Sequence, residues 1–154
     1  MFSLIVTVIS IALVAALAIA TLYFGGEAFN QGTLEAKAST VVNQAQQIDG
    51  ANTIYRTDEG SYAGNLSNDL VSDYLGSTPA VDDSISTSAT GWTVAGTGDR
   101  TVILDSVVDG VCDKIDEQVG LDPTATTGDE AAVATAEVPY GCDDTGTFYF
   151  SPDN

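Results

Sequence analysis

The stretch MFSLIVTVISIALVAALAIATLYF, residues 1–24, decides the fold because it contains no charged residue, no proline and no glycine. As a helix that rises ~1.5 Å per residue it reaches ~36 Å, which exceeds the ~30 Å hydrocarbon layer of a bilayer. A cleaved secretory signal is the alternative, but its apolar region usually has only ~7–15 residues between a basic start and a small-residue cleavage site. The stretch therefore predicts a helix that is surrounded by lipid or by other apolar surface.

Four hydroxyl side chains interrupt this apolar stretch, namely Ser3, Thr7, Ser10 and Thr21. At ~100° per residue they lie within a ~60° arc of the helix and form one stripe. Small and hydroxyl-bearing residues allow apolar helices to approach closely, so the stripe is suited to packing against another helix. Alternatively, each hydroxyl bonds a carbonyl one turn earlier in its own helix. The sequence leaves both interpretations open.

Beyond Gly25 and Gly26, apolar residues recur at alternating spacings of four and three, and Asn52 interrupts the series before Tyr55. The members of the series are Leu34, Ala38, Val41, Ala45 and Ile48. This spacing predicts an amphipathic helix over residues 25–55 that packs on a downstream domain. The first ~55 residues then form one long helix. Because each glycine weakens a helix by ~1 kcal/mol relative to alanine, we expect a kink or unwound patch near Gly25, Gly26 and Gly32.

The pattern of residues 56–154 predicts a globular head. The whole chain is then expected to have an α+β fold in which the long helix packs on a small antiparallel sheet. GWTVAG, residues 91–96, and RTVIL, residues 100–104, flank a glycine-containing turn and predict a hairpin. SVVDGVCDKIDEQVG, residues 106–120, predicts a helix that stops at Gly120, and GTFYF, residues 146–150, predicts a last strand. The spacing of apolar residues over residues 66–75 predicts a further helical stretch, and residues 132–138 are expected to be extended.

Charge and composition exclude several function classes. The chain has 22 acidic and 4 basic residues, a formal net charge of −18, and no histidine. Direct nucleic-acid binding is not expected, because phosphate contacts depend mainly on Lys and Arg. The absence of histidine removes the commonest general base and zinc ligand, so no cofactor and no metal site are predicted.

The chain's two cysteines, Cys112 and Cys142, are expected to form a disulfide. A membrane-spanning start makes an oxidising outer compartment plausible for the head. The chain-entropy model gives such a bond ~3–4 kcal/mol of stabilisation. Two free thiols are the alternative.

The order of these features resembles the bacterial type IV pilins, especially the type IVb branch and related pilin-like proteins. QAQQIDGANTIYRTDEGSYAG, residues 44–64, followed by LVSDYL, residues 70–75, looks like the end of the pilin helix and its αβ loop. VCDKIDEQVG, residues 111–120, with the later GC and TGTFYF, resembles the disulfide-bounded C-terminal region. The resemblance covers essentially the whole chain.

This resemblance implies a structural subunit of an extracellular filament on the cell surface. Such a subunit is inserted in the inner membrane, meets the pilus assembly machinery, and polymerises with identical subunits through its N-terminal helix. The family N-methylates its first mature residue, which makes Met1 the processing and methylation residue if it begins the mature chain rather than translation. The alternative is a minor pilin, a pseudopilin or another single-pass membrane-anchored domain.

One residue departs from the family pattern. The family usually has glutamate at the fifth mature position, where it meets the N-terminal amine of a neighbour, and this chain has Ile5. We therefore expect side-chain packing and the stripe of Ser3, Thr7, Ser10 and Thr21 to set the register of a filament. Gly25 and Gly26 would supply local unwinding.

An enzyme is not predicted. Its candidate residues would be a serine with Lys37 or Lys114, or an acidic pair, Asp82–Asp83 or Asp143–Asp144. Among 22 acidic residues, sequence neighbours are weak evidence for catalysis, and a solvated acidic surface is the better explanation of these pairs. The same carboxylates could hold Ca²⁺, although no EF-hand spacing is present.

Two patterns suggest covalent modification. Asn65-Leu66-Ser67 fits the N-x-S motif for glycosylation, and SISTSAT, residues 84–90, offers hydroxyls for O-linked sugars. Both patterns also occur in ordinary surface loops.

Overall fold

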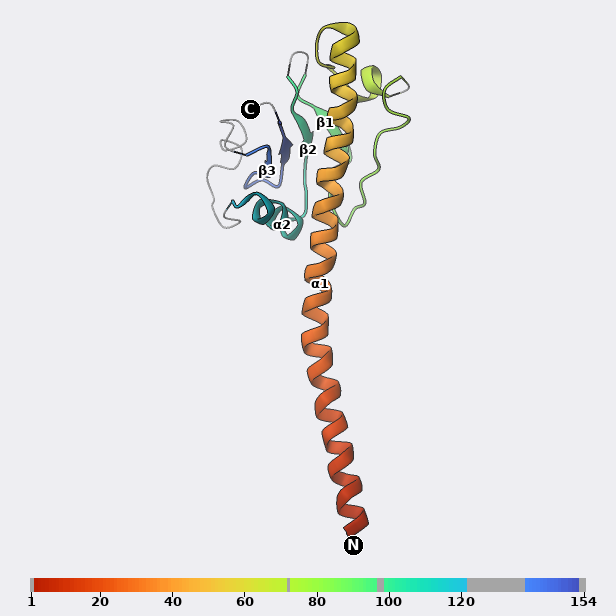
Figure 1. Ribbon diagram of the computed structural model, residues 1–154, viewed down its shortest axis with the longest axis vertical. Coiled ribbons are helices and arrows are strands. Elements are labelled where there is room, and N and C mark those ends of the chain that lie inside the picture. The colour runs from red at the N-terminus through yellow and green to blue at the C-terminus, as the bar shows by residue number, and fades with distance from the viewer. Residues whose placement is uncertain (1, 72, 97–98, 122–137, 153–154) are drawn as a thin grey trace. The chain divides into compact units, whose positions relative to one another are not determined.

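The computed structural model describes residues 2–71, 73–96, 99–121 and 138–152. The chain divides into two compact units, Met1–Leu34 and Glu35–Asn154, and each is described by itself. Helix α1 (Phe2–Glu59) contributes to both units and has 58 residues (Figure 1). The expectation of one long helix over the first ~55 residues is therefore confirmed.

The second part of α1, from residue 35 onward, buries one stripe of side chains. Four members of the apolar series, Ala38, Val41, Ala45 and Ile48, each have an exposed fraction of 0%. The first member, Leu34, is only half-buried. The predicted amphipathic pattern thus marks the side of α1 that packs on the head.

The sheet is four-stranded and antiparallel, with the order β1-β2-β4-β3. Its strands are β1 (Trp92–Val94), β2 (Val102–Leu104), β3 (Tyr140–Cys142) and β4 (Phe148–Phe150). Trp92, Leu104 and Phe148 lie opposite one another across three strands and are buried, whereas the neighbouring row of Thr93, Ile103 and Tyr149 is only half-buried. This period-two alternation gives the sheet one core face.

The predicted hairpin is confirmed as β1 and β2, and the predicted last strand as β4. Strand β3 was not expected from the sequence. The extended piece predicted for residues 132–138 falls almost entirely outside the described residues, and Val138 itself is not part of a strand.

Helix α2 (Asp109–Val119) confirms the predicted helix and its stop. Gly120 follows with φ of 80°, a left-handed conformation that glycine adopts without the penalty of a Cβ atom. Val111 and Ile115 are fully buried on one side of α2. Figure 1 shows α2 beside the end of the sheet that contains β3.

Helical structure between residues 66 and 75 is shorter than its spacing suggests. Among the described residues of this stretch it is confined to η1 (Leu66–Leu70), a single π-helical turn whose buried residues are Leu66 and Leu70. Val71 already has extended dihedral angles, φ −74° and ψ 135°, and pairs with Leu75 through an isolated bridge. Asn65 caps the turn because its side chain accepts hydrogen bonds from the backbone N–H groups of Ser67 and Asn68.

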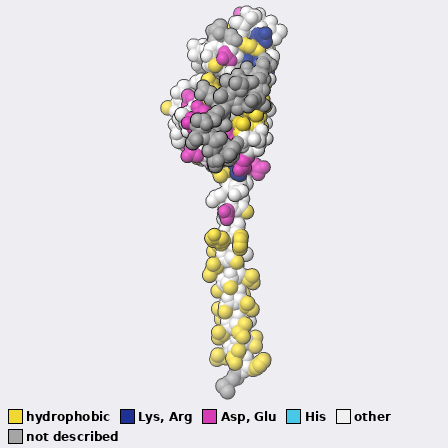
Figure 2. Space-filling model, turned by 90° about the vertical axis from the view of Figure 1, so that its left-hand side faces the viewer, with side chains coloured by type: hydrophobic (Ala, Val, Ile, Leu, Met, Phe, Trp, Pro, Cys, Tyr) yellow, Lys and Arg dark blue, Asp and Glu magenta, His cyan; other side chains and the backbone are white. Residues whose placement is uncertain are grey.

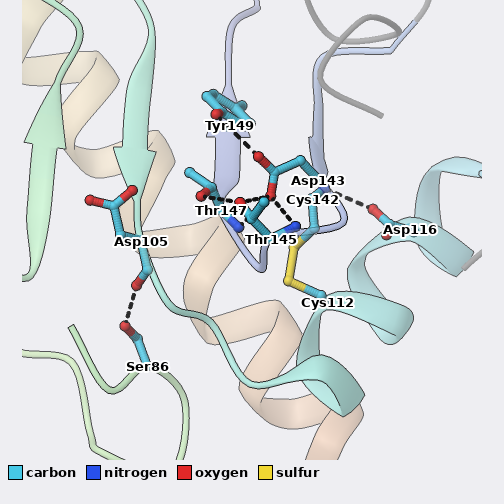
Figure 3. Close-up of a disulfide and its surroundings, with 9 residues drawn as sticks. All are labelled: Ser86, Asp105, Cys112, Asp116, Cys142, Asp143, Thr145, Thr147 and Tyr149. Atoms are coloured by element: carbon cyan, nitrogen blue, oxygen red, sulfur yellow. Dashed lines mark hydrogen bonds between the residues drawn. A yellow bond between two sulfur atoms is a disulfide. The ribbon is translucent and has the colours of Figure 1, made fainter. Parts of the chain in front are cut away.

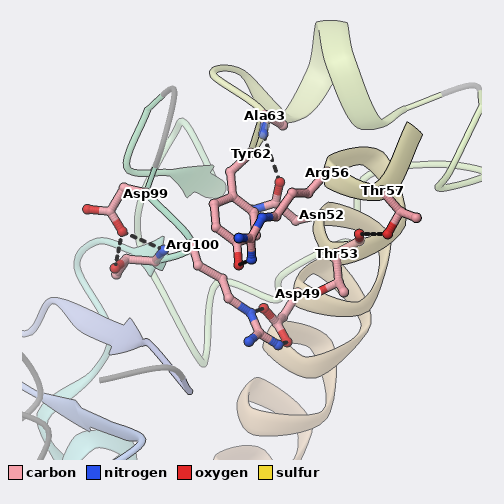
Figure 4. Close-up of polar contacts among 10 residues, drawn as sticks. Asp49, Asn52, Thr53, Arg56, Thr57, Tyr62, Ala63, Asp99 and Arg100 are labelled. Atoms are coloured by element: carbon pink, nitrogen blue, oxygen red, sulfur yellow. Dashed lines mark hydrogen bonds and ion pairs between the residues drawn. The ribbon is translucent and has the colours of Figure 1, made fainter. Parts of the chain in front are cut away.

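Polar contacts also hold the second part of α1 to the head (Figure 4). Arg100, which follows the turn between β1 and β2, donates from Nε and Nη2 to the two carboxylate oxygens of Asp49, at 2.6 Å and 2.8 Å. One turn later, Asn52 Oδ1 accepts a hydrogen bond from the backbone N–H of Ala63 at 2.9 Å. The polar residue that interrupts the apolar series is thus itself a buried contact.

Candidate functional site

The most distinctive surface of the chain is the apolar surface, defined here as the side chains of residues 2–24. Every one of these residues is exposed, and the large apolar members range from 49% exposed at Val6 to 84% at Phe2. Figure 2 shows hydrophobic side chains covering the visible face of this segment. α1 is also the helix that is long and apolar enough to cross a membrane, among the residues that the structure describes.

This surface cannot remain in water at low free energy. Burying apolar area stabilises by ~25 cal/mol for each Å². The many exposed branched side chains therefore favour any environment that covers them over water. Because apolar side chains surround the helix rather than forming one stripe, the covering medium must enclose it. Acyl chains of a bilayer and other apolar helices both satisfy that requirement.

The hydroxyl stripe is largely satisfied within its own helix. Thr7 Oγ1 donates to the carbonyl of Leu4 at 2.8 Å, and Ser10 Oγ donates to the carbonyl of Val6 at 2.8 Å. Thr21 Oγ1 likewise bonds the carbonyl of Ala18 at 2.9 Å. These bonds match the intrahelical interpretation, and a role of the stripe in helix-to-helix packing stays a prediction.

The glycines of α1 do not interrupt it in this chain. Helical structure continues through Gly25, Gly26 and Gly32, and a Cβ atom added at any of them would meet nothing within 4 Å. Neither backbone conformation nor crowding therefore requires glycine here. The unwound patch is absent from the described chain, and unwinding in an assembled state stays a prediction.

The predicted disulfide joins Cys112 of α2 to Cys142 of β3, with Cα atoms 5.6 Å apart (Figure 3). Asp116, one turn after Cys112, accepts a hydrogen bond from the backbone N–H of Cys142 at 2.9 Å. Asp116 is only 4% exposed, so this carboxylate and the disulfide form two adjacent links between α2 and β3. Together they close the C-terminal region of the head.

One member of each candidate acidic pair, Asp82 and Asp143, accepts hydrogen bonds within a turn. Asp143 Oδ1 accepts hydrogen bonds from the backbone N–H groups of Thr145 and Thr147, at 2.9 Å and 2.7 Å. Asp82 Oδ1 accepts from the backbone N–H of Ser84 at 2.8 Å. Hydrogen bonds from Ser84 hold the pKa of the Asp82 carboxyl below its ordinary value, with a smaller contribution from Lys37.

The candidate lysines are likewise engaged. Lys37 Nζ donates to the backbone carbonyl of Ser84 at 3.3 Å, and Lys114 Nζ binds the Glu117 carboxylate at 2.6 Å. In the described ranges, no group of three or more His, Cys, Asp or Glu residues is placed to hold a metal ion. The prediction that the chain is not an enzyme and holds no cofactor stays a prediction.

The two modification patterns differ in accessibility. Asn65 is exposed. In the SISTSAT segment, however, Ser86 is only 3% exposed and its hydroxyl donates to the carbonyl of Asp105 at 2.6 Å (Figure 3). Ser86 is therefore not an accessible acceptor for a sugar. Met1, the predicted methylation residue, lies outside the described residues.

Several contacts that position the head could not be recognised from the sequence. Gln44 of α1 accepts a hydrogen bond from the indole N–H of Trp92 at 3.0 Å and donates to the carbonyl of Ala80 at 3.0 Å. Gln44 and Trp92 are 48 residues apart. Only the break in the apolar series at Asn52 is visible in the sequence as a signal.

No protein-family model, curated protein or solved structure matches this chain. The geometry of the described residues is therefore the basis for assigning a function.

Proposed function

We propose that the chain is a structural subunit of an extracellular, type IV pilus-like filament that polymerises through residues 1–24. One observation carries the proposal. A helical segment exposes apolar side chains on all sides and, within the same helix, is followed by a stripe that packs on a disulfide-closed head.

The physical argument concerns what can replace lipid around this segment. Outside a bilayer, the free energy of the apolar surface is lower when other copies of the same helix cover it than when water does. Identical subunits provide that cover in unlimited number. All 22 acidic residues lie after residue 24, so the heads favour water while the helices associate.

The partners and location follow from the same argument. Before assembly the helix resides in the inner membrane, where it is available to an assembly machinery. After assembly the chain is part of a fibre on the cell surface. Direct binding to nucleic acid is not part of the proposal, because four basic residues face a net charge of −18.

A second candidate is a single-pass anchored domain, such as a minor pilin or pseudopilin. Ile5 favours it, since a carboxylate at that position is the usual partner of a neighbour's amine in the resembling family. The hydroxyls of Thr7 and Ser10 favour it too, because they bond carbonyls of their own helix.

The deciding experiment is the composition of sheared surface fibres from the cells that make this chain. We expect mass spectrometry to identify it as the main component, with a mass that also gives its first residue. If the chain is found only in detergent extracts of the membrane while the fibres contain another protein, the anchored-domain alternative is correct.

A matched pair of variants tests the role of the helix. Thr7→Leu should reduce the fibre yield without unfolding the head, whereas Thr57→Leu should leave the yield unchanged. Both hydroxyls bond a carbonyl of their own helix, at 2.8 Å and 2.9 Å, so the comparison isolates position along α1. Equal yields from both variants would remove the stripe from the assembly mechanism.

A further inference from the structure

Strand β1 forms one edge of the sheet, and no backbone group of the described residues pairs with its outer side. Ala95 N–H donates to the carbonyl of Thr101 at 3.0 Å. Because bonded pairs alternate in an antiparallel ladder, Thr93 makes the next pair with β2. The N–H and C=O groups of Trp92 and Val94 therefore point away from β2, toward the free edge.

A hollow of about 270 Å³ lies at this edge, between β1 and η1. Its polar lining comes from the side chains of Asn65, Ser67, Thr78 and Thr90, and the two residues with outward backbone groups, Trp92 and Val94, also line it. The hydroxyls of Thr78 and Thr90 bond no other group in the part of the chain that the structure describes, and both residues are exposed. The Ser67 hydroxyl donates to Asn65 Oδ1 at 2.9 Å, so the groups that remain open to a ligand are the two threonine hydroxyls, the Asn65 amide nitrogen and the outward backbone groups of Trp92 and Val94.

The hollow is uncharged in a strongly acidic protein. Every described residue that lines it lacks an ionisable side chain. The cationic residues are occupied elsewhere: Lys37 by the carbonyl of Ser84, Arg56 by Tyr62, Arg100 by Asp49, and Lys114 by Glu117. With a net charge of −18, the chain repels anions, and the hollow offers them no counter-charge.

We propose that this hollow binds one neutral pyranose ring. Each sugar hydroxyl both donates and accepts a hydrogen bond, which suits a lining of outward N–H and C=O groups mixed with threonine hydroxyls and an amide. Pockets for drug-sized ligands begin at ~300 Å³, so a space of about 270 Å³ fits one ring rather than an oligosaccharide. The proposal does not depend on filament formation.

The test uses the ¹⁵N-labelled full chain in dodecylphosphocholine micelles, because detergents with sugar headgroups would compete. Methyl β-glucopyranoside, methyl β-galactopyranoside and N-acetylglucosamine are titrated separately, with glucuronate as the charged control. We expect a neutral sugar to give saturable amide shifts at millimolar concentration, confined to residues 64–67, 78 and 90–94. Absence of saturable shifts for all three neutral sugars, or equal shifts with glucuronate, overturns the proposal.

A pair of variants in one loop distinguishes the hollow from general surface binding. Thr90→Val removes a hydroxyl from the lining and should weaken binding about fivefold, as expected for one lost hydrogen bond. Thr87→Val removes an exposed hydroxyl that does not line the hollow and should leave the affinity unchanged. Unchanged amide chemical shifts elsewhere in the head verify that both variants are folded. Equal sugar affinities for the two variants would contradict the site.

Discussion

The two parts of α1 use apolar side chains in opposite ways. Residues 2–24 expose theirs on every side, whereas residues 38–52 bury one stripe that includes the polar Asp49 and Asn52, at 8% and 0% exposure. Both parts are helical, and both contain alanine, valine and isoleucine. The difference shows that apolar content alone does not decide burial. Spacing selects a buried side, and polar contacts such as Asp49 with Arg100 fix what it packs against.

The largest contrast is expected from placing a charge at an exposed apolar residue in each part. Val14→Arg should abolish membrane insertion and fibre formation, because arginine at the centre of a membrane helix costs ~2.5–3.5 kcal/mol or more. Ile54→Arg should permit both. Val14 and Ile54 are 67% and 55% exposed, so neither variant unfolds the head. Membrane fractionation and fibre yield measure the outcome, and insertion of the Val14 variant at the normal level would contradict the role of residues 2–24.

The converse contrast concerns the stability of the head. Ile48→Ala should lower the free energy of unfolding by ~2–5 kcal/mol, because Ile48 is fully buried and its truncation leaves a cavity. Ile11→Ala, at a residue that is 70% exposed, should leave it unchanged. Thermal unfolding followed by the near-ultraviolet signal of Trp92 reports on both variants in micelles. Similar losses would mean that the two parts of α1 are not energetically distinct.

The disulfide is expected to stabilise the head and have no effect on the helix of residues 2–24. Replacing Cys112 and Cys142 together by alanine should cost ~3 kcal/mol, since the bond closes a loop of sequence separation 30. Denaturant unfolding of the head gives the loss, and circular dichroism at the helical minimum reports on α1. A double variant as stable as the parent would show that Asp116 and the surrounding packing hold β3 without the bond.

Two glycines should respond to alanine with opposite signs. Gly146 has φ of 77°, and an added Cβ would lie 2.8 Å from the carbonyl oxygen of Val107, so Gly146→Ala should destabilise the head by ~1–2 kcal/mol or more. Gly25→Ala should instead stabilise the helix by ~1 kcal/mol, because nothing lies within 4 Å. Unfolding curves measure the first effect and hydrogen exchange near residue 25 the second. Loss of fibres in the second variant would support glycine-dependent unwinding during assembly.

The smallest effect concerns pH and is confined to the head, since residues 2–24 contain no acidic or basic side chain. The pKa of Asp82 is lowered from 3.8 by hydrogen bonds from Ser84, so its contribution to stability is present above pH 3.8 and is lost as the pH falls through the lower folded value. Burial and the nearby Asp109 and Glu117 raise the pKa of Asp113. NMR titration of the carboxyl carbons should give these opposite directions. Asp113→Asn should slightly stabilise the head at neutral pH, whereas Asp82→Asn should not.

The elements with strong local patterns could be predicted from the sequence. The long helix, the β1–β2 hairpin, helix α2 with its stop at Gly120, strand β4 and the disulfide all follow from residue spacing or from the two cysteines. Strand β3 could not, because its residues, Tyr140–Cys142, follow no period and are strand only through pairing with β4. The short η1 could not be delimited either, since apolar spacing over residues 66–75 does not specify where hydrogen bonding ends.

The sequence by itself determined that this chain has an apolar helix, an amphipathic continuation and an acidic head with one disulfide, because each depends on composition or on spacing within a short stretch. Only the tertiary structure decided that Asp49 meets Arg100, that Gln44 meets Trp92, and that the edge of the sheet at β1 faces an uncharged hollow. These contacts join residues about fifty positions apart or different elements. Which residues form such pairs depends on how the sheet packs on α1. The pattern of residues within a short stretch of sequence does not specify that packing.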